Sequence, residues 1–312
     1  MTTTRMSPAL VAEAVRPRKS TIWRSHDGWL LDVAGEGLRV LGRDLQVRAR
    51  FPCQLDQRGH HAVNPDLRYA ALAEATRIRL IDRDGRTRWE VPHEHWGDYG
   101  RGSCWIPAAV PCVWATVPGA QDYDEWWVLE LQSGRLLARG ELLAQQAGSV
   151  HFPHPDGRHV ALSTGEGQDG AEIYWGLWDG TGKWIRRFDS RERCLADVSP
   201  DGSRFLTTSH SSGDGRLAVH RFPGGEVLAA RTPDSTFEDP GARFEYQAAF
   251  VRDDLIVACS FDGDEAVALT ADLTSSNALD YPPGSDRVPL ASDGAGCWLT
   301  GGAARLQIWT LG

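Results

Sequence analysis

Short runs of apolar and β-branched residues alternate with polar turns along the whole chain, and no long apolar stripe repeats with the period of an α-helix. Three runs follow related turn motifs. These are Asn-Pro-Asp at 64–66, His-Pro-Asp-Gly at 154–157 and Ser-Pro-Asp-Gly at 199–202. Proline presets φ, aspartate bonds back to the backbone, and glycine adopts positive φ without strain. Each motif therefore predicts a tight turn that leads into a strand, and these strands lie at 68–73, 158–163 and 204–209.

The turns mark a repeat. Pro155 and Pro200 are 45 positions apart, Pro65 lies two such intervals before Pro155, and Pro111 falls near the missing point between them. Similar turns at 26–28, 252–254 and 292–294 extend the register to seven points. In four copies a second strand ends before a glycine turn and is followed by another strand. These pairs are 78–82 with 87–91, 127–130 with 135–139, 175–179 with 184–188, and 217–221 with 226–230.

Four short strands in about 40–45 residues is the size of one propeller blade. One such sheet cannot bury both of its faces, so we expect it to stack on neighbours around an axis. This predicts an all-β fold, a seven-bladed β-propeller of four-stranded blades, with six or eight blades as open alternatives. The last repeat has room for three strands and ends at 305–310. Residues 9–15 have the pattern of the missing strand, so we expect segment 1–17 to close the last blade of a single domain at 18–312.

The turn motifs, together with Trp178-Asp179-Gly180, resemble the WD40 family of propellers over essentially the whole chain. Trp309-Thr310 holds the equivalent place in the last repeat. The repeats are degenerate, because the Gly-His pair of the family is irregular, so its buried His–Ser–Trp–Asp tetrad does not carry over to most blades. Residues 81–89 and 178–184 have a weaker similarity to quinoprotein-type propellers, where a tryptophan packs between blades. We predict that role for Trp89 and Trp184, without a quinone cofactor.

Charge and cysteine content exclude several classes of protein. Lys+Arg total 33 and Asp+Glu 42, and a net charge of −9 repels a phosphate backbone, so we expect no nucleic-acid partner. The six cysteines include no C-x-x-C pair, which favours free thiols in a reducing compartment. No segment has the apolar length of a signal peptide core or a membrane span. We therefore expect a cytoplasmic protein, of bacterial type from its preference for arginine over lysine, with no membrane partner and an undetermined oligomeric state.

Acidic residues recur in the predicted connections between second and third strands, which emerge on one face of a propeller. They are Glu36, Glu74, Asp122, Asp124, Glu166, Asp169, Asp214, Asp262 and Asp264. Blade-to-blade connections bring Trp96 and Tyr99 to the same face, and Tyr123 lies beside the acidic pair. Aromatic anchors among carboxylates suit a basic peptide or protein segment, through cation–π contacts and charge steering. We predict a non-catalytic protein-interaction scaffold, although turn propensity and solubility also account for acidic turns.

Histidines supply the alternative of an enzyme. His60 and His61 precede one turn, His93 and His95 follow, and His151, His154 and His159 surround another. Adjacent strand residues face opposite sides, so we favour structural roles and predict no metal, no cofactor and no catalytic residue. A metal-dependent lyase, hydrolase or lactonase at the channel mouth, with His61, His93 and Glu74 as first suspects, stays open. So does a small-molecule or glycan binder at the same mouth.

Overall fold

The computed structural model describes residues 4–55, 59–97, 101–119, 123–144, 148–165, 170–188, 192–210, 213–239 and 241–311. In these residues the chain forms β-strands throughout, and its one helical element is the 3-10 turn Pro233–Ser235. The all-β prediction is therefore confirmed. No helix among the described residues is long and apolar enough to cross a membrane.

The chain divides into two compact units, which are described separately. The first unit comprises Met1–Arg18, Arg43–Leu45 and Glu192–Gly312, and the second comprises Lys19–Gly42 and Gln46–Arg191. In both units the consecutive strands of each sheet pair antiparallel with one another, apart from the two N-terminal strands, which join sheets formed by the end of the chain, one of them in parallel. This is the pattern that short strands joined by tight turns produce.

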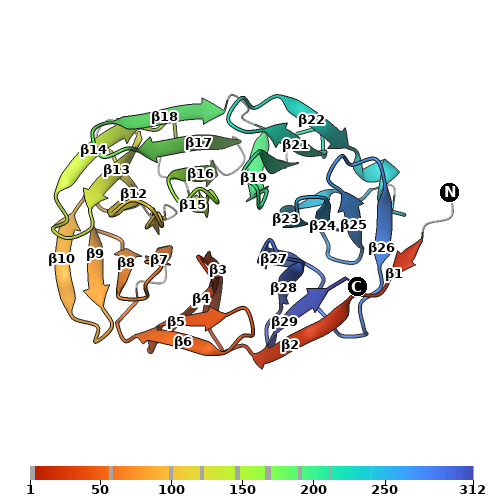
Figure 1. The fold of residues 1–312 in the computed structure, drawn as a ribbon, viewed down its shortest axis with the longest axis horizontal. Helices are drawn as coiled ribbons and strands as arrows, with labels where there is room; N and C mark the ends of the chain where they lie inside the picture. The colour runs from red at the N-terminus through yellow and green to blue at the C-terminus, as the bar shows by residue number, and fades with distance from the viewer. Residues whose placement is uncertain are drawn as a thin grey trace. The chain divides into compact units, whose positions relative to one another are not determined.

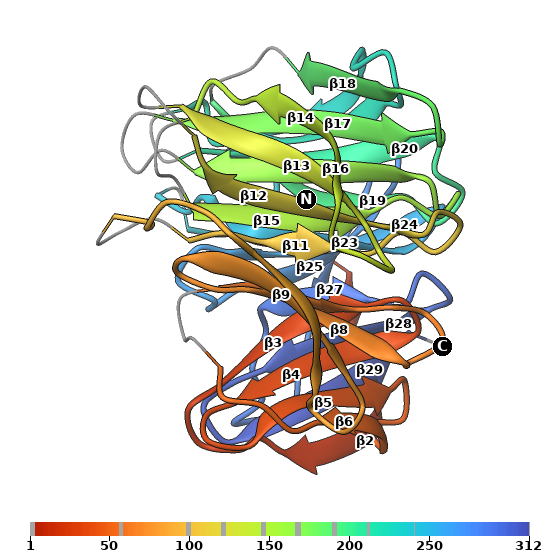
Figure 2. The ribbon, with the colours of Figure 1, turned by 90° about the vertical axis from the view of Figure 1, so that its left-hand side faces the viewer.

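The second unit contains four sheets of four strands each (Figure 2). The first is β3 (Ser20–Ser25), β4 (Gly28–Val33), β5 (Gly37–Gly42) and β6 (Val47–Phe51). The next is β7 (His61–Val63), β8 (Tyr69–Ala73), β9 (Arg77–Asp82) and β10 (Thr87–Pro92). The third is β11 (Cys104–Trp105), β12 (Cys112–Pro118), β13 (Asp124–Glu130) and β14 (Leu136–Glu141). The fourth is β15 (Gly148–Pro153), β16 (His159–Gly165), β17 (Ala171–Trp178) and β18 (Lys183–Phe188).

The first unit contains three sheets. One is β19 (Arg193–Val198), β20 (Arg204–Ser209), β21 (Leu217–Arg221) and β22 (Val227–Arg231). Another is β23 (Phe244–Arg252), β24 (Leu255–Ser260), β25 (Ala266–Thr270) and β26 (Ser276–Leu279), to which β1 (Arg5–Met6) adds a parallel fifth strand. The last is β27 (Pro289–Ser292), β28 (Cys297–Gly301), β29 (Arg305–Thr310) and β2 (Ala9–Val15). The β1 strand was not predicted.

The N-terminal strand completes the last sheet, as predicted. β2 runs antiparallel to β29, with Leu10 opposite Trp309, and Figure 1 shows the two strands side by side. Gln307 donates a hydrogen bond to the Glu13 carboxylate at 2.8 Å, which adds a side-chain contact to the backbone ladder. The chain's first strand and its last one therefore stabilise each other within the first unit.

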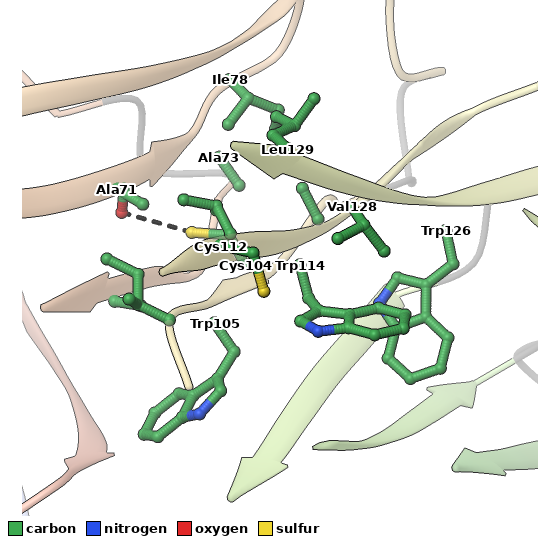
Figure 3. Packing of buried hydrophobic residues seen from close by; sticks show 14 of the residues in the cluster. Ala71, Ala73, Ile78, Cys104, Trp105, Cys112, Trp114, Trp126, Val128 and Leu129 are labelled. Atoms are coloured by element: carbon green, nitrogen blue, oxygen red, sulfur yellow. Dashed lines mark hydrogen bonds between the residues drawn. The ribbon is translucent and has the colours of Figure 1, made fainter. Parts of the chain in front are cut away.

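Tryptophans fill the core of the second unit (Figure 3). The rings of Trp114 and Trp126 are fully buried, and their centroids lie 4.5 Å apart. Gly176 makes room for them, because a Cβ at that position would lie 2.8 Å from the tips of both indoles. Trp89 donates a hydrogen bond to the carbonyl of Leu131 in the neighbouring sheet at 2.8 Å, which confirms its predicted place between sheets. Trp184 was predicted to do the same but stays 38% exposed, so that prediction is wrong.

Candidate functional site

The acidic residues occupy the connections that the sequence predicted. Glu36 follows β4 and Glu74 follows β8, Asp214 lies between β20 and β21, and Asp262 and Asp264 lie between β24 and β25. The predicted acidic residues that the structure describes therefore lie in connections between the second and third strands of a sheet. The exception is Asp124, which begins β13. Four of the predicted site residues lie outside the described residues. These are Tyr99, Asp122, Glu166 and Asp169.

Three of the predicted binding residues are buried. Trp96 is 2% exposed, Asp124 is 3% exposed, and Glu74 is buried as well. Backbone hydrogen bonds hold Asp124 on both sides, because its N–H donates to Ala144 at 2.7 Å and its carbonyl accepts from Leu142 at 2.8 Å. The prediction that these three side chains are presented to a partner is wrong. The sequence pattern placed them in connections but carried no information on their burial.

Arginines of the same chain neutralise several of the carboxylates. The Glu74 carboxylate contacts Arg77 and Arg79, each at 2.5 Å, and its hydrogen bond raises the pKa of the Arg77 guanidinium. Glu36 pairs with Arg39. At a distance, the electric field of each of these carboxylates is cancelled by that of its arginine. These residues therefore do not add to a negative potential over the connections, as the sequence had led us to expect.

The same arginine pairing occurs at two further carboxylates. Asp214 lies 3.3 Å from Arg193 and 3.4 Å from Arg216. The fully buried Glu172, which the sequence analysis missed, binds Arg187 through both carboxylate oxygens, at 2.6 and 2.7 Å. Half of the predicted acidic residues that the structure describes are therefore internal partners of arginine, namely Glu36, Glu74 and Asp214. This is a structural use of charge that the excess of arginine over lysine could have signalled.

One aromatic and acidic surface in the first unit differs from this pattern. Phe261, in the connection after β24, is 59% exposed, and its ring meets that of Tyr246 edge-on at 5.9 Å. The Tyr246 ring in turn lies 6.4 Å from that of His210. We call this surface the Phe261 patch and define it as Tyr246, Phe261, Asp262 and Asp264; the His210 side chain that contacts Tyr246 is itself buried. Sequence reasoning identified its two aspartates and missed its aromatic residues.

The carboxylates of the two aspartates in the Phe261 patch are not paired with an arginine, in contrast to Glu74 and Asp214. Ser260 donates a hydrogen bond to the Asp262 carboxylate at 2.5 Å and the Asp264 N–H donates at 3.1 Å, and these bonds lower the pKa of Asp262. Arg287 donates to the backbone carbonyl of Asp264, not to its carboxylate. Neither aspartate forms an ion pair with another residue in the described part of the chain. Both carboxylates are thus available to a cation from outside.

The neighbouring Glu265 connects two loops through hydrogen bonds. Its carboxylate accepts hydrogen bonds from the backbone N–H groups of Glu238 at 2.8 Å and Asp239 at 3.1 Å. These bonds attach the long connection that precedes β23 to the β24–β25 connection. These hydrogen bonds hold the β24–β25 connection, which carries Phe261, to the neighbouring connection.

The first suspects for an enzyme do not converge. His61 lies 3.7 Å from the carboxylate of Asp32, Glu74 is occupied by arginines, and His93 bonds through Nδ1 to the carbonyl of Glu94 at 2.6 Å. Within the described ranges, one group of three potential metal ligands comes together, and it consists of His154, Asp156 and His159. The channel-mouth metal site suggested for His61, His93 and Glu74 is not formed by these side chains.

A buried polar network in the second unit was also missed by the sequence analysis. Trp126 donates to Nε2 of His151 at 2.8 Å, and Nδ1 of His151 bonds to Oγ of Ser103 at 2.7 Å. Ser149 continues the network to Ser103 at 2.8 Å and to Thr116 at 2.7 Å. Since Nε2 accepts, Nδ1 carries the hydrogen, so His151 cannot take a proton from Ser103. The network is structural and does not form a nucleophile–base pair.

Comparison with known proteins supports the fold. No family model matches the chain, and no curated protein matches it by sequence. Among solved structures it is similar to the Cps50 (Swd1) β-propeller domain of Myceliophteria thermophila, with 10% identity over 98% of this chain and 100% of the other and a TM-score of 0.65. The Neurospora crassa Pan2 WD40 domain matches with 11% identity, 98% and 96% coverage and a TM-score of 0.60. U3-55K matches with 12% identity, 98% and 100% coverage and a TM-score of 0.61.

These similarities confirm the predicted fold. The chain has the fold of a seven-bladed β-propeller of the WD40 type, with four-stranded blades of which one gains β1 as a further strand. At these identities the similarity establishes architecture and not activity.

Proposed function

We propose that the protein is a non-catalytic interaction scaffold that binds a basic segment of a protein partner at the Phe261 patch. The exposure of Phe261 supports this proposal most directly. It is the most exposed aromatic side chain among the described residues, and two unpaired aspartates lie within three positions of it. A large apolar side chain rimmed by charge is typical of a contact surface.

The chemistry of the Phe261 patch favours a cationic ligand. An arginine guanidinium over the face of Phe261 or Tyr246 gains about 0.5–2 kcal/mol from the ring quadrupole. Asp262 and Asp264 attract the same cation and can accept its hydrogen bonds. Charge attraction of this kind speeds association and weakens with salt, so we expect binding to fall as ionic strength rises.

The nature and location of the partner belong to the same proposal. The net charge of −9 disfavours nucleic acid and anionic membrane surfaces, which supports a protein partner. All six cysteines are free thiols, which supports a reducing compartment such as the cytoplasm.

Binding to labelled peptides tests the function. Fluorescein-labelled peptides that carry arginine and lysine, and charge-inverted peptides of the same length, are titrated with the full-length protein and followed by anisotropy. We expect basic peptides alone to bind. The substitution F261A should weaken binding about tenfold or more, since a central aromatic anchor contributes about 1–2 kcal/mol or more.

Matched variants make the test specific. D262N/D264N should reduce both the affinity and its dependence on salt, whereas W184A, at another exposed aromatic residue, should leave both unchanged. Equal binding by wild type and F261A, or no binding of any basic peptide by the wild type, would overturn the proposal. Proteins retained from the native host by wild type and W184A, but lost with F261A, would then identify the partner.

A further inference from the structure

The turn between β15 and β16 brings two histidines and an aspartate together. One oxygen of the Asp156 carboxylate lies 3.1 Å from Nδ1 of His154, and the other lies 2.5 Å from Nδ1 of His159. The potential ligand atoms of the three side chains all lie within 4.8 Å of one another. His154 is buried, His159 is half-buried and Asp156 is exposed, so the group is open to solvent on one side.

The same turn occurs twice elsewhere with different side chains. In each copy the first residue pairs through its N–H with the carbonyl five positions later, at 3.3 Å for His154 and 2.9 Å for Ser199. Asn64 makes the same bond to Tyr69 at 3.1 Å. The fourth residue has positive φ in all three copies, which are Leu67 at 59°, Gly157 at 68° and Gly202 at 72°.

These copies show what the turn itself requires. Ser199 accepts the N–H of Arg204 on its hydroxyl at 3.0 Å, and Asn64 accepts the N–H of Tyr69 on its side-chain oxygen at 2.8 Å. A small polar side chain at the first position and an aspartate at the third are thus sufficient to close the turn. Histidine is not needed at the first position or at the sixth.

We propose that His154, Asp156 and His159 form a binding site for one divalent transition-metal ion, of which Zn²⁺ is the principal candidate. Two imidazole nitrogens and a carboxylate oxygen are the donor set that Zn²⁺ accepts, with a fourth position left to water or to a side chain of a partner. This site is independent of the Phe261 patch, which lies in the other unit.

The distances suit a small tetrahedral ion. With bonds of about 2.0–2.1 Å, neighbouring ligand atoms of a tetrahedral Zn²⁺ are about 3.3 Å apart. Nδ1 of His159 lies 2.5 Å from Oδ2 of Asp156, so this pair has to open by less than 1 Å. No two ligand atoms of the group are further apart than 4.8 Å, so the widest pair has to close by at most about 1.5 Å. Rotation of the side chains about χ1 and χ2 supplies such a movement without changing the turn.

Asp156 supplies the negative charge. Burial acts to raise its pKa, but hydrogen bonds from the His159 side chain and from the backbone N–H groups of Arg158 and His159 outweigh burial and lower that pKa well below its usual value. The backbone bonds both reach one oxygen, Oδ1, so Oδ2 can exchange its contact with His159 for the metal. An ion bound to Oδ2 and to Nδ1 of His154 then replaces this contact and the hydrogen bond that Nδ1 accepts from the Asp156 N–H at 3.3 Å. The two bonds to Oδ1 and the backbone bonds of the turn stay in place.

Zinc binding by the tag-free, full-length protein tests this site. The protein is treated with EDTA, dialysed and titrated with Zn²⁺ alone against a chromophoric chelator. We expect one tightly bound Zn²⁺ per chain and no comparable binding of Mg²⁺. The double substitution H154S/H159R copies the side chains of the turn at 199–204, so it should fold but bind Zn²⁺ more weakly by at least about tenfold, the loss that even an outer partner of a ligand causes.

Two further variants separate metal binding from folding. D156N keeps the oxygen that caps the turn but loses the charge, so it should stay folded, with a lower thermal midpoint because the ionised carboxylate accepts the hydrogen bonds of the turn more strongly, and it should lose Zn²⁺ affinity. H95S removes an exposed histidine outside the cluster and should bind as the wild type does.

Fluorescence gives an independent measurement. The Trp184 ring meets that of His159 edge-on at 5.9 Å, so Cu²⁺ at the site should quench a component of emission that W184F lacks. Zinc binding that is unchanged in both D156N and H154S/H159R, or absent in the wild type, would overturn the proposal.

Discussion

Trp126 and His151 meet in the core of the second unit through a hydrogen bond of 2.8 Å from the indole nitrogen to Nε2. Trp126 belongs to β13 and His151 to β15, so this bond joins two neighbouring sheets. It also fixes the histidine tautomer, because an accepting Nε2 leaves the hydrogen on Nδ1, where it reaches Ser103 at 2.7 Å. One neutral imidazole of β15 thus satisfies two buried polar groups of the neighbouring sheet, the Trp126 indole N–H and the hydroxyl of Ser103, which directly precedes β11.

Replacing this histidine should destabilise the fold. H151L leaves the buried Trp126 N–H without a partner, which costs about 1–3 kcal/mol. It also removes one hydrogen bond of the Ser103 hydroxyl, which still bonds to Ser149. We expect the free energy of unfolding to fall by about 2–5 kcal/mol in urea titrations. H95L, at an exposed histidine, should change it by less than about 0.5 kcal/mol. Equal stability of H151L and H95L would show that the network is dispensable.

Buried histidines should make the protein sensitive to acid. Burial is the main cause that lowers the pKa of His60 and His151 to about 3 and that of His220 to about 4. In the unfolded chain these three histidines become protonated near pH 6.5, whereas in the folded chain they stay neutral. The free energy of unfolding therefore falls as pH drops below 6.5. Each group should cost about 1–2 kcal/mol between pH 7 and pH 5, measured by urea unfolding at several pH values. A flat profile over this range would contradict these pKa shifts.

Asp32 should act in the opposite direction. Burial raises the pKa of this carboxyl to about 6, so the folded protein holds a proton that the unfolded chain has lost above its usual pKa of 3.8. Protonation of Asp32 therefore favours the folded state in acid, and this contribution to the free energy of unfolding is lost as pH rises from about 4 to 6. D32N removes this titration. The variant should therefore gain about 1–3 kcal/mol relative to wild type at pH 7, and the gain should shrink toward pH 4. An unchanged difference at both pH values would exclude a titrating Asp32.

The sequence predicted the turns and most strands because their chemistry is local. Proline, aspartate and glycine specify the turn at 199–202 wherever it lies in the fold. β2 was predictable because the last repeat lacked one strand, whereas β1 was not, since Arg5–Met6 is too short to show a pattern. The Trp126–His151 bond joins residues 25 positions apart and depends on how two sheets pack. Residue type alone carries no signal of it.

The candidate site shows the same division. The order of the strands predicts which connection contains each acidic residue. Whether the side chain of that residue is exposed depends on packing, which the sequence pattern does not show. Glu74 could have been recognised as internally paired, because Arg77 and Arg79 follow it closely on the next strand. The aromatic neighbours of Phe261 could not, because Tyr246 comes from the preceding strand of that sheet and its contact depends on register.

Removing the N-terminal strand should destabilise the whole fold if the propeller is one cooperative domain, as we propose. A chain that starts at Arg18 lacks β2 and leaves β29 with an open edge. We expect a markedly lower thermal midpoint and a single transition. A chain that starts at Ser7 lacks β1 but keeps β2, so its midpoint should fall much less, because β1 contributes only two paired residues. Equal midpoints for the chain from Arg18 and the full chain would refute a stabilising role for β2.

Charge reversal at two aspartates should separate binding from stability. Asp264 is exposed beside Phe261 and forms no ion pair with the described residues, so D264K should leave the thermal midpoint within about 2 °C and repel a basic peptide. Asp124 is 3% exposed and bonded through its backbone to Leu142 and Ala144, so D124K forces a cation into the core. That variant should lose about 3 kcal/mol or more. The measurements are thermal unfolding and peptide anisotropy on the same samples. If D264K unfolds early or D124K is as stable as wild type, the assignment of Asp264 to the surface and Asp124 to the core is wrong.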